Sequence, residues 1–275
     1  MNRIDRRFET LRAAGRRALV PYLTAGDPDP ALTVPLLHAV VEAGADLIEL
    51  GVPFSDPMAD GPVIQAACER ALGRGMSLRR TLELVARFRE DDAATPVVLM
   101  GYLNPIEAMG CEAFAAAAAE AGVDGVLTVD MPPEEGEALG AALRARGLHP
   151  VYLLAPTTPS DRIRRICDAA GGFVYYVSLK GVTGSDALDT EAVARRVAAI
   201  RRQTTLPIGV GFGIRDGASA ARVACFADAV IVGSALVRRV AEAGPQRAVA
   251  AARALVAELR AAMDGACVQG EARAG

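Results

Sequence analysis

Short runs of aliphatic and β-branched residues alternate along the chain with longer stretches rich in Ala, Arg and Glu. Runs of this kind are typical of buried strands, and the stretches between them are typical of helices. The runs predict eight strands, at Ala18–Leu23, Leu47–Leu50, Val97–Met100, Val126–Val129, Val151–Leu154, Phe173–Val177, Ile208–Val210 and Ala229–Val232. Helices are predicted after them, at about Asp29–Ala43, Val63–Asp91, Cys111–Ala121, Pro133–Arg146, Ser160–Ala169, Thr190–Arg202, Asp216–Ala224 and from Ser234 onward.

Eight strands that are each followed by a helix predict an α/β fold with a parallel sheet and right-handed crossovers. In a chain of 275 residues, this pattern favours a single (β/α)8 TIM barrel over an open doubly wound sheet. Ahead of the first strand, Ile4, Phe8 and Leu11 recur at helical spacing and predict an N-terminal capping helix. Since no linker divides the chain, we expect one domain over residues 1–275, with a frayed tail at about residues 266–275.

The composition excludes several classes of protein. The chain is 52% hydrophobic and 23% charged, as ordinary globular domains are. Its net charge of −3 argues against a protein that binds nucleic acid by broad electrostatic attraction. Because no apolar run approaches the ~18 residues of a membrane span, we expect no membrane partner either.

The cysteines and histidines point to neither a metal site nor a disulfide framework. The five cysteines are scattered without any CxxC spacing, which is typical of reduced thiols in a cytoplasmic protein. The two histidines, His38 and His149, have no His or Cys near them in sequence. We therefore predict no metal site and a cytoplasmic location.

Glu49 breaks the apolar pattern of the second predicted strand. Side chains alternate along a strand, so Glu49 shares a face with Leu47. Both faces of a barrel strand are normally apolar, because one contacts the helices and the other fills the barrel. If Glu49 points inward, desolvation raises its pKa toward neutrality, as a group that both gives and takes protons requires. An ion pair between Glu49 and an Arg at the strand end is the alternative.

A second acidic group follows in the loop after the same strand. Asp56 and Asp60 lie within Ser55–Pro62, and Asp60 precedes a Pro that favours the first turn of a helix. A capping role therefore suits Asp60 taken alone. Two carboxylates in distinct environments can also divide catalytic work, one exchanging protons and the other staying ionised.

Glycine-rich turns follow the seventh and eighth predicted strands, at Gly209–Gly213 and at Gly233 with Ser234. Glycines let backbone amides approach an anion closely, and Ser234 begins a predicted helix whose N-terminus attracts negative charge. The loops after these two strands form the recurrent phosphate site of TIM barrels. Ordinary tight turns are the alternative interpretation.

Several motifs occur together in the chain. The most specific is Leu47–Pro57 with Ala59–Pro62, and it is accompanied by Met100–Pro105, Asp130–Glu135, Ser178 with Gly181–Gly184, Gly209–Ile214 and Gly233–Ser234. In this combination the chain resembles the tryptophan synthase α subunit family, from about Phe8 to about Leu259.

The resemblance implies retro-aldol cleavage of indole-3-glycerol phosphate to indole and glyceraldehyde 3-phosphate, without a cofactor on this chain. Glu49 would be the acid/base that protonates indole C3 and receives the proton of the glycerol hydroxyl. Asp60 would accept the indole N–H and stabilise the positive charge that develops on the ring.

The resemblance also implies a binding pocket. Its substrate-binding walls would be Tyr22, Met100, Tyr102, Leu127, Leu153, Tyr175, Phe212 and Ile231, with Thr183 bonding Asp60 from a closing loop. The phosphate would bind Gly184, Gly213, Gly233 and Ser234. This chain departs from the family in having Tyr22 in place of the usual Phe, in its Met100 and Val129, and in Ser185 with Asp186 after Gly184.

The family further implies a partner, a pyridoxal phosphate β subunit that receives indole in an αββα tetramer. Three other functions remain open on the sequence. The chain could be a free-standing lyase without a β subunit, or a non-catalytic subunit that only activates its partner. A Schiff-base aldolase would need Lys180, the one lysine, which follows the sixth strand on a loop where an exposed side chain is the simpler expectation.

Overall fold

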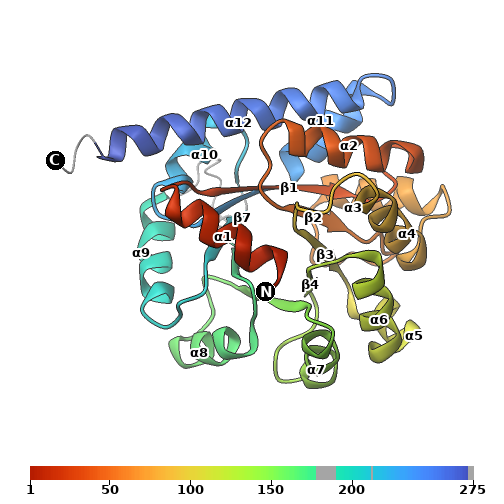
Figure 1. Ribbon diagram of the computed structural model, residues 1–275, viewed down its shortest axis with the longest axis horizontal. Helices are drawn as coiled ribbons and strands as arrows, with labels where there is room; N and C mark the ends of the chain where they lie inside the picture. Colours follow the sequence, from red (N-terminus) through yellow and green to blue (C-terminus); the bar gives the residue numbers. More distant parts are fainter. Residues whose placement is uncertain (178–189, 212, 272–275) are drawn as a thin grey trace.

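Eight parallel strands close into a barrel with helices around the outside (Figure 1). The computed structural model describes residues 1–177, 190–211 and 213–271, with side chains up to residue 266. The strands are β1 (Ala18–Thr24), β2 (Ile48–Gly51), β3 (Val97–Gly101), β4 (Gly125–Thr128), β5 (His149–Leu154), β6 (Val174–Val177), β7 (Ile208–Gly211) and β8 (Ala229–Val232). They pair in chain order and β8 pairs with β1, which confirms the predicted TIM barrel.

The helices of the described residues follow the predicted order. They are α1 (Arg3–Ala13), α2 (Pro30–Glu42), α3 (Pro62–Leu72), α4 (Leu78–Arg89), α5 (Leu103–Met109), α6 (Cys111–Ala121), α7 (Glu137–Ala145), α8 (Ser160–Ala169), α9 (Thr190–Arg201), α10 (Gly217–Ala224), α11 (Ser234–Ala243) and α12 (Ala248–Glu271).

Three helical segments differ from the prediction. The stretch expected to be one helix over Val63–Asp91 is two helices, because Gly75 turns the chain at φ +76° and Ser77 caps α4. Helix α5 was not predicted, and the last helical stretch divides into α11 and α12 at Gly244, whose φ is +70°. Helix α12 continues to Glu271, into the segment where we expected a frayed tail; residues 272–275 lie outside the described residues.

The predicted capping helix closes the amino-terminal end of the barrel. Ile4, Phe8 and Leu11 of α1 are buried and join one cluster with the inward-facing residues of the strands. The ring of Phe8 lies 5.9 Å from that of Phe173, which extends this cluster to β6. Because α1 covers this end of the barrel, a site that is open to solvent has to lie at the other end.

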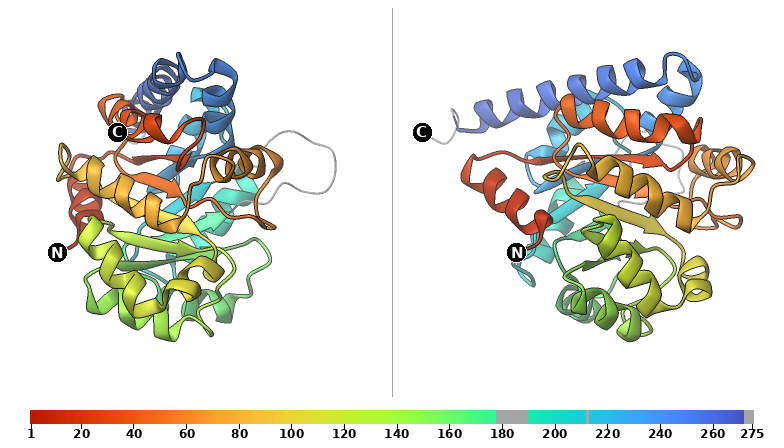
Figure 2. Two further views of the ribbon diagram at one scale, coloured as in Figure 1. Left: turned by 90° about the vertical axis from the view of Figure 1, so that its right-hand side faces the viewer. Right: turned by 45° about the vertical axis from the view of Figure 1, so that its right-hand side comes forward.

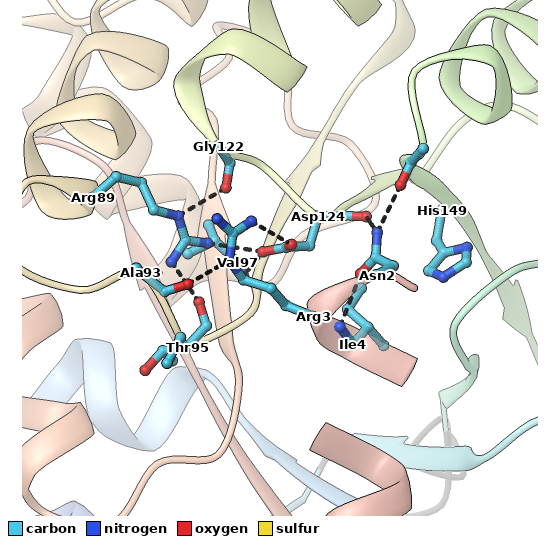
Figure 3. A network of polar contacts seen from close by, with 12 residues as sticks. Asn2, Arg3, Ile4, Arg89, Ala93, Thr95, Val97, Gly122, Asp124 and His149 are labelled. Atoms are coloured by element: carbon cyan, nitrogen blue, oxygen red, sulfur yellow. Dashed lines mark hydrogen bonds and ion pairs between the residues drawn. The ribbon is translucent and has the colours of Figure 1, made fainter. Parts of the chain in front are cut away.

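Asp124 ties α1 to the strands beneath it (Figure 3). Its Oδ1 accepts a hydrogen bond from Arg3 at 2.9 Å, and its Oδ2 accepts bonds from Arg89 at 2.8 Å and from the Val97 N–H at 2.9 Å. Its carbonyl oxygen accepts from Asn2 Nδ2 at 2.9 Å. Asp124 is only 2% exposed, so this network joins α1, α4, β3 and β4 through one buried carboxylate.

Helix α12 lies along α2 and packs on α10 and α11 (Figure 2). Its Arg260 is buried and donates to Asp46 Oδ2 at 3.2 Å and to the Arg17 carbonyl at 3.0 Å. The chain's last helix is thereby bonded to the loops that precede β1 and β2. Of the helices in the described part of the chain, none is both long and apolar enough to cross a membrane.

Replacing Asp124 by Asn should lower the free energy of unfolding by about 3 kcal/mol, because Arg89 is then left buried without its counter-charge. Urea denaturation measures the change. The control is Asp91→Asn at an exposed position just after α4, which should alter stability by less than about 0.5 kcal/mol. Equal effects of the two substitutions would contradict the structural role of Asp124.

Candidate active site at the carboxyl end of the barrel

Glu49 points into the barrel from β2. It stands two residues after Leu47, whose side chain belongs to the cluster that fills the barrel, so the two share a face. Glu49 is level with Tyr22 of β1 and Val98 of β3, and it is only 2% exposed. Its Oε1 has no hydrogen-bond partner, and no Arg forms an ion pair with it among the described residues. The alternative of a Glu–Arg pair is therefore wrong.

Burial determines the protonation of Glu49. Desolvation of the carboxylate, with a smaller contribution from the charge of Asp60, raises the pKa of Glu49 to about 8. The side chain is thus mostly protonated at neutral pH, and ionisation at a slightly higher pH is accessible. A carboxyl group of this kind can both donate and accept a proton near neutrality.

Asp60 lies in the loop between β2 and α3. Tyr102, directly after β3, donates a hydrogen bond from its hydroxyl to Asp60 Oδ2 at 2.9 Å. Burial raises the pKa of Asp60, and the bond from Tyr102 opposes that rise. The expected capping role is not observed, because the N-cap of α3 is Gly61. Asp60 is instead held against the barrel mouth with one carboxylate oxygen bonded to a phenol.

Tyr102 also fixes the backbone of this loop. Its hydroxyl accepts a hydrogen bond from the Ala59 N–H at 3.0 Å, and its ring stacks on Phe54 at 5.0 Å between centroids. Sequence reasoning placed Tyr102 in the apolar wall and missed these polar contacts. A signal was available, since a buried Tyr usually finds a hydrogen-bond partner where a Phe would not need one.

Two further tyrosines flank Glu49. The rings of Tyr22 and Tyr175 lie over Gly51 and Gly211, where an added Cβ would approach their hydroxyl oxygens to 2.0 Å and 2.2 Å. Burial raises the pKa of both phenols, and the charge of Glu49 contributes to the rise in each. Both phenols therefore stay neutral. Their rings fit at these positions because the neighbouring strand residues, Gly51 and Gly211, have no Cβ.

Other predicted wall residues line the barrel interior below and beside Glu49. They are Met100 on β3, Leu127 on β4, Leu153 on β5 and Ile231 on β8. Phe212, Thr183 and Gly184 lie outside the described residues, as do Lys180, Ser185 and Asp186. The structure thus places these four residues, with Tyr175, in the one cluster that fills the barrel interior.

The glycine turns after β7 and β8 occupy the same end of the barrel. Gly213 has φ +78°, a conformation that strains any residue with a Cβ. Gly233 is the N-cap of α11, so no N-cap side chain bonds the first N–H groups of this helix. The first helical residue, Ser234, is exposed. The first N–H groups of a helix have no partner within it, so this turn suits an anion. In the described part of the chain, no cluster of three His, Cys, Asp or Glu side chains fits a metal ion.

Comparison with known proteins gives one consistent result. The model of the family described as "Tryptophan synthase alpha chain" matches residues 8–264. The tryptophan synthase alpha chain of Thioalkalivibrio sulfidiphilus is 67% identical over 266 residues, which cover 96% of this chain and 100% of the relative. That of Dechloromonas aromatica is 62% identical over 264 residues, covering 96% and 98%. The crystal structure of tryptophan synthase subunit alpha from Legionella pneumophila superposes with a TM-score of 0.91 at 47% identity, covering 96% of this chain and 99% of that one.

The raised pKa of Glu49 makes stability depend on pH. The folded chain keeps this carboxyl protonated up to about pH 8, whereas the unfolded chain ionises it near 4.5. The stability that this difference contributes is complete below pH 4.5 and is lost as the pH rises toward 8. Between pH 5 and 8.5, the free energy of unfolding of the wild type should therefore fall by about 4 kcal/mol relative to Glu49→Gln. Urea denaturation of both chains measures the difference, and parallel pH profiles would contradict the shifted pKa.

Proposed function

Because the chain belongs to the tryptophan synthase alpha chain family, we propose that Glu49 and Asp60 are the two groups that perform its reaction. The chain is a carbon–carbon lyase that cleaves indole-3-glycerol phosphate to indole and glyceraldehyde 3-phosphate. Its partner is the β subunit of tryptophan synthase, which uses the indole to make L-tryptophan. The observation that supports the catalytic roles is the buried carboxyl group of Glu49, whose Oε1 bonds none of the described residues, near the bonded carboxylate of Asp60.

Glu49 acts first as an acid in this proposal. Its proton goes to indole C3, and the electron pair of the C2–C3 double bond forms the new C–H bond. The ring nitrogen then carries a positive charge. Glu49, now ionised, next takes the proton of the hydroxyl on the carbon attached to C3. That carbon becomes the aldehyde of glyceraldehyde 3-phosphate as the C–C bond breaks, and its electron pair restores the indole ring. Glu49 ends protonated, ready for another cycle.

Asp60 stabilises the charged intermediate. Its second carboxylate oxygen, Oδ1, would accept the indole N–H, while Tyr102 holds Oδ2. A fixed carboxylate in a site that excludes water stabilises a positive ring more strongly than water does. Because the ring itself accepts the electrons of the breaking bond, the proposal needs no metal and no Schiff base.

The remaining predicted residues would bind the substrate. We assign the indole ring to the wall formed by Tyr22, Met100, Leu127, Leu153, Tyr175 and Ile231, with Tyr102 at its edge. The phosphate would bind the turns at Gly213, Gly233 and Ser234, for which the positive φ of Gly213 and the uncapped start of α11 are the support. Thr183, Gly184 and Phe212 keep their proposed roles from the family resemblance.

We also propose the αββα assembly, a cytoplasmic location and a single-domain organisation. For the location, the free state of the described cysteines Cys68, Cys111, Cys167 and Cys225 is the support. For the single domain, the support is that all eight strands form one barrel and that α12 packs on α2, α10 and α11. A free-standing lyase and a non-catalytic activating subunit are less consistent with the family match, and an assay separates them.

Indole release from indole-3-glycerol phosphate tests the function directly. The purified chain should release indole slowly by itself and faster when the β subunit of the same organism is added. Rapid release that does not respond to the β subunit would instead indicate a free-standing lyase. Release only in the presence of the β subunit would favour an activating role, and no release under either condition would contradict lyase activity.

Substitution of each acid tests its role. Glu49→Gln should lower kcat by about 10²–10⁴-fold with little change in substrate binding, because it removes the exchangeable proton. Asp60→Asn should lower kcat by about 10²-fold, because the amide carries no charge to oppose that of the ring. Both are measured by indole release, with circular dichroism to check folding. Near-normal turnover in either variant would remove that residue from the mechanism.

A further inference from the structure

The loop that carries Asp60 is held from two sides. On the barrel side, the Tyr102 hydroxyl donates a hydrogen bond to the Asp60 carboxylate and accepts one from the Ala59 N–H. On the other side, Gln65 of α3 reaches back across the start of the helix. Its Nε2 donates to the carbonyl oxygen of Asp60 at 2.8 Å and, at a longer 3.4 Å, to that of Pro57. Pro57 and Asp60 also close a tight turn, in which the Asp60 N–H donates to the Pro57 carbonyl at 3.0 Å.

Gln65 links this turn to a fixed part of the molecule. The N-cap of α3, Gly61, makes no side-chain hydrogen bond, so the amide of Gln65 supplies a side-chain contact at this helix start. Helix α3 itself is anchored, because Ile64 and Cys68 on either side of Gln65 in sequence are buried. Since a peptide group is planar, a donor on the Asp60 carbonyl restricts rotation of the backbone next to its carboxylate.

We propose that Gln65 is a positioning residue, which holds Asp60 so that its Oδ1 meets the indole N–H. The inference rests on the proposed role of Asp60 and extends it to a residue outside the pocket. Gln65 is exposed, so the loss of its two bonds should disturb folding little. Catalysis is more sensitive, because a misplacement of about 1 Å can lower a rate by about 10²-fold.

Gln65→Met tests the proposal, because Met has similar length and helix propensity but no N–H donor. The matched control is Glu69→Met, an exposed position one turn further along the same helix. Both variants are studied as full chains assembled with the β subunit. Calorimetry measures the Kd of indole-3-propyl phosphate, which presents an indole N–H, and of glycerol 3-phosphate, which does not. Thermal denaturation checks stability, and indole release gives kcat.

In Gln65→Met we expect about tenfold weaker binding of indole-3-propyl phosphate, unchanged binding of glycerol 3-phosphate and an unchanged Tm, with kcat lowered about tenfold or more. Glu69→Met should match the wild type in every measurement. In an Asp60→Asn background, Gln65→Met should cause no further loss of indole-3-propyl phosphate affinity, since the group that it positions has already lost its charge.

Four results would overturn the proposal. Unchanged affinity and kcat in Gln65→Met would show that Asp60 needs no such contact. Equal loss of both ligands would show a general disturbance of the pocket, and additive losses in the double variant would separate Gln65 from Asp60. If Asp60→Asn alone binds indole-3-propyl phosphate normally and keeps full turnover, the assigned role of Asp60 fails, and the inference that rests on it fails with it.

Discussion

The inward-facing register of β2 is the constraint on which the site depends. A strand exposes alternate side chains to opposite faces, so a shift of one residue would move Glu49 from the barrel interior to the helices outside. Pairing with β1 and β3 prevents that shift, because Glu49 is level with Tyr22 on one side and Val98 on the other. Burial at this register raises the pKa of the carboxyl to about 8, and the chemistry of the site follows from that protonation state.

The two ends of the barrel have separate tasks. At the amino-terminal end, α1 closes the barrel. The buried carboxylate of Asp124 accepts hydrogen bonds there from two Arg side chains and one backbone N–H. At the carboxyl end, Glu49 Oε1 is buried and has no partner within the part of the chain that the structure describes, which would be costly in a purely structural role. Such a group is more consistent with a functional role than with packing, and the proposed substrate would supply the missing contact.

Several features were predictable from sequence because they depend on residues close together in the chain. The apolar runs identified all eight strands, and the spacing of Ile4, Phe8 and Leu11 identified α1. The division of Val63–Asp91 into α3 and α4 was missed, because the helical pattern resumes after the turn at Gly75 and conceals the break. For Asp60 taken alone, the sequence favoured a capping role. The structure excludes that role, because Gly61 is the N-cap of α3 and the Asp60 carboxylate bonds Tyr102 instead.

The sequence by itself determined the order of strands and helices, the closed barrel that this order favours, and the presence of two acids after one strand. It also carried motifs specific enough to indicate the family. The tertiary structure alone decided that Glu49 Oε1 is buried with no hydrogen-bond partner among the described residues, that Asp60 bonds a phenol 42 residues away, and that Gln65 holds the same loop from its outer side. The reason is physical: periodicity reflects local geometry, whereas desolvation and hydrogen bonding depend on which distant segments barrel closure brings into contact.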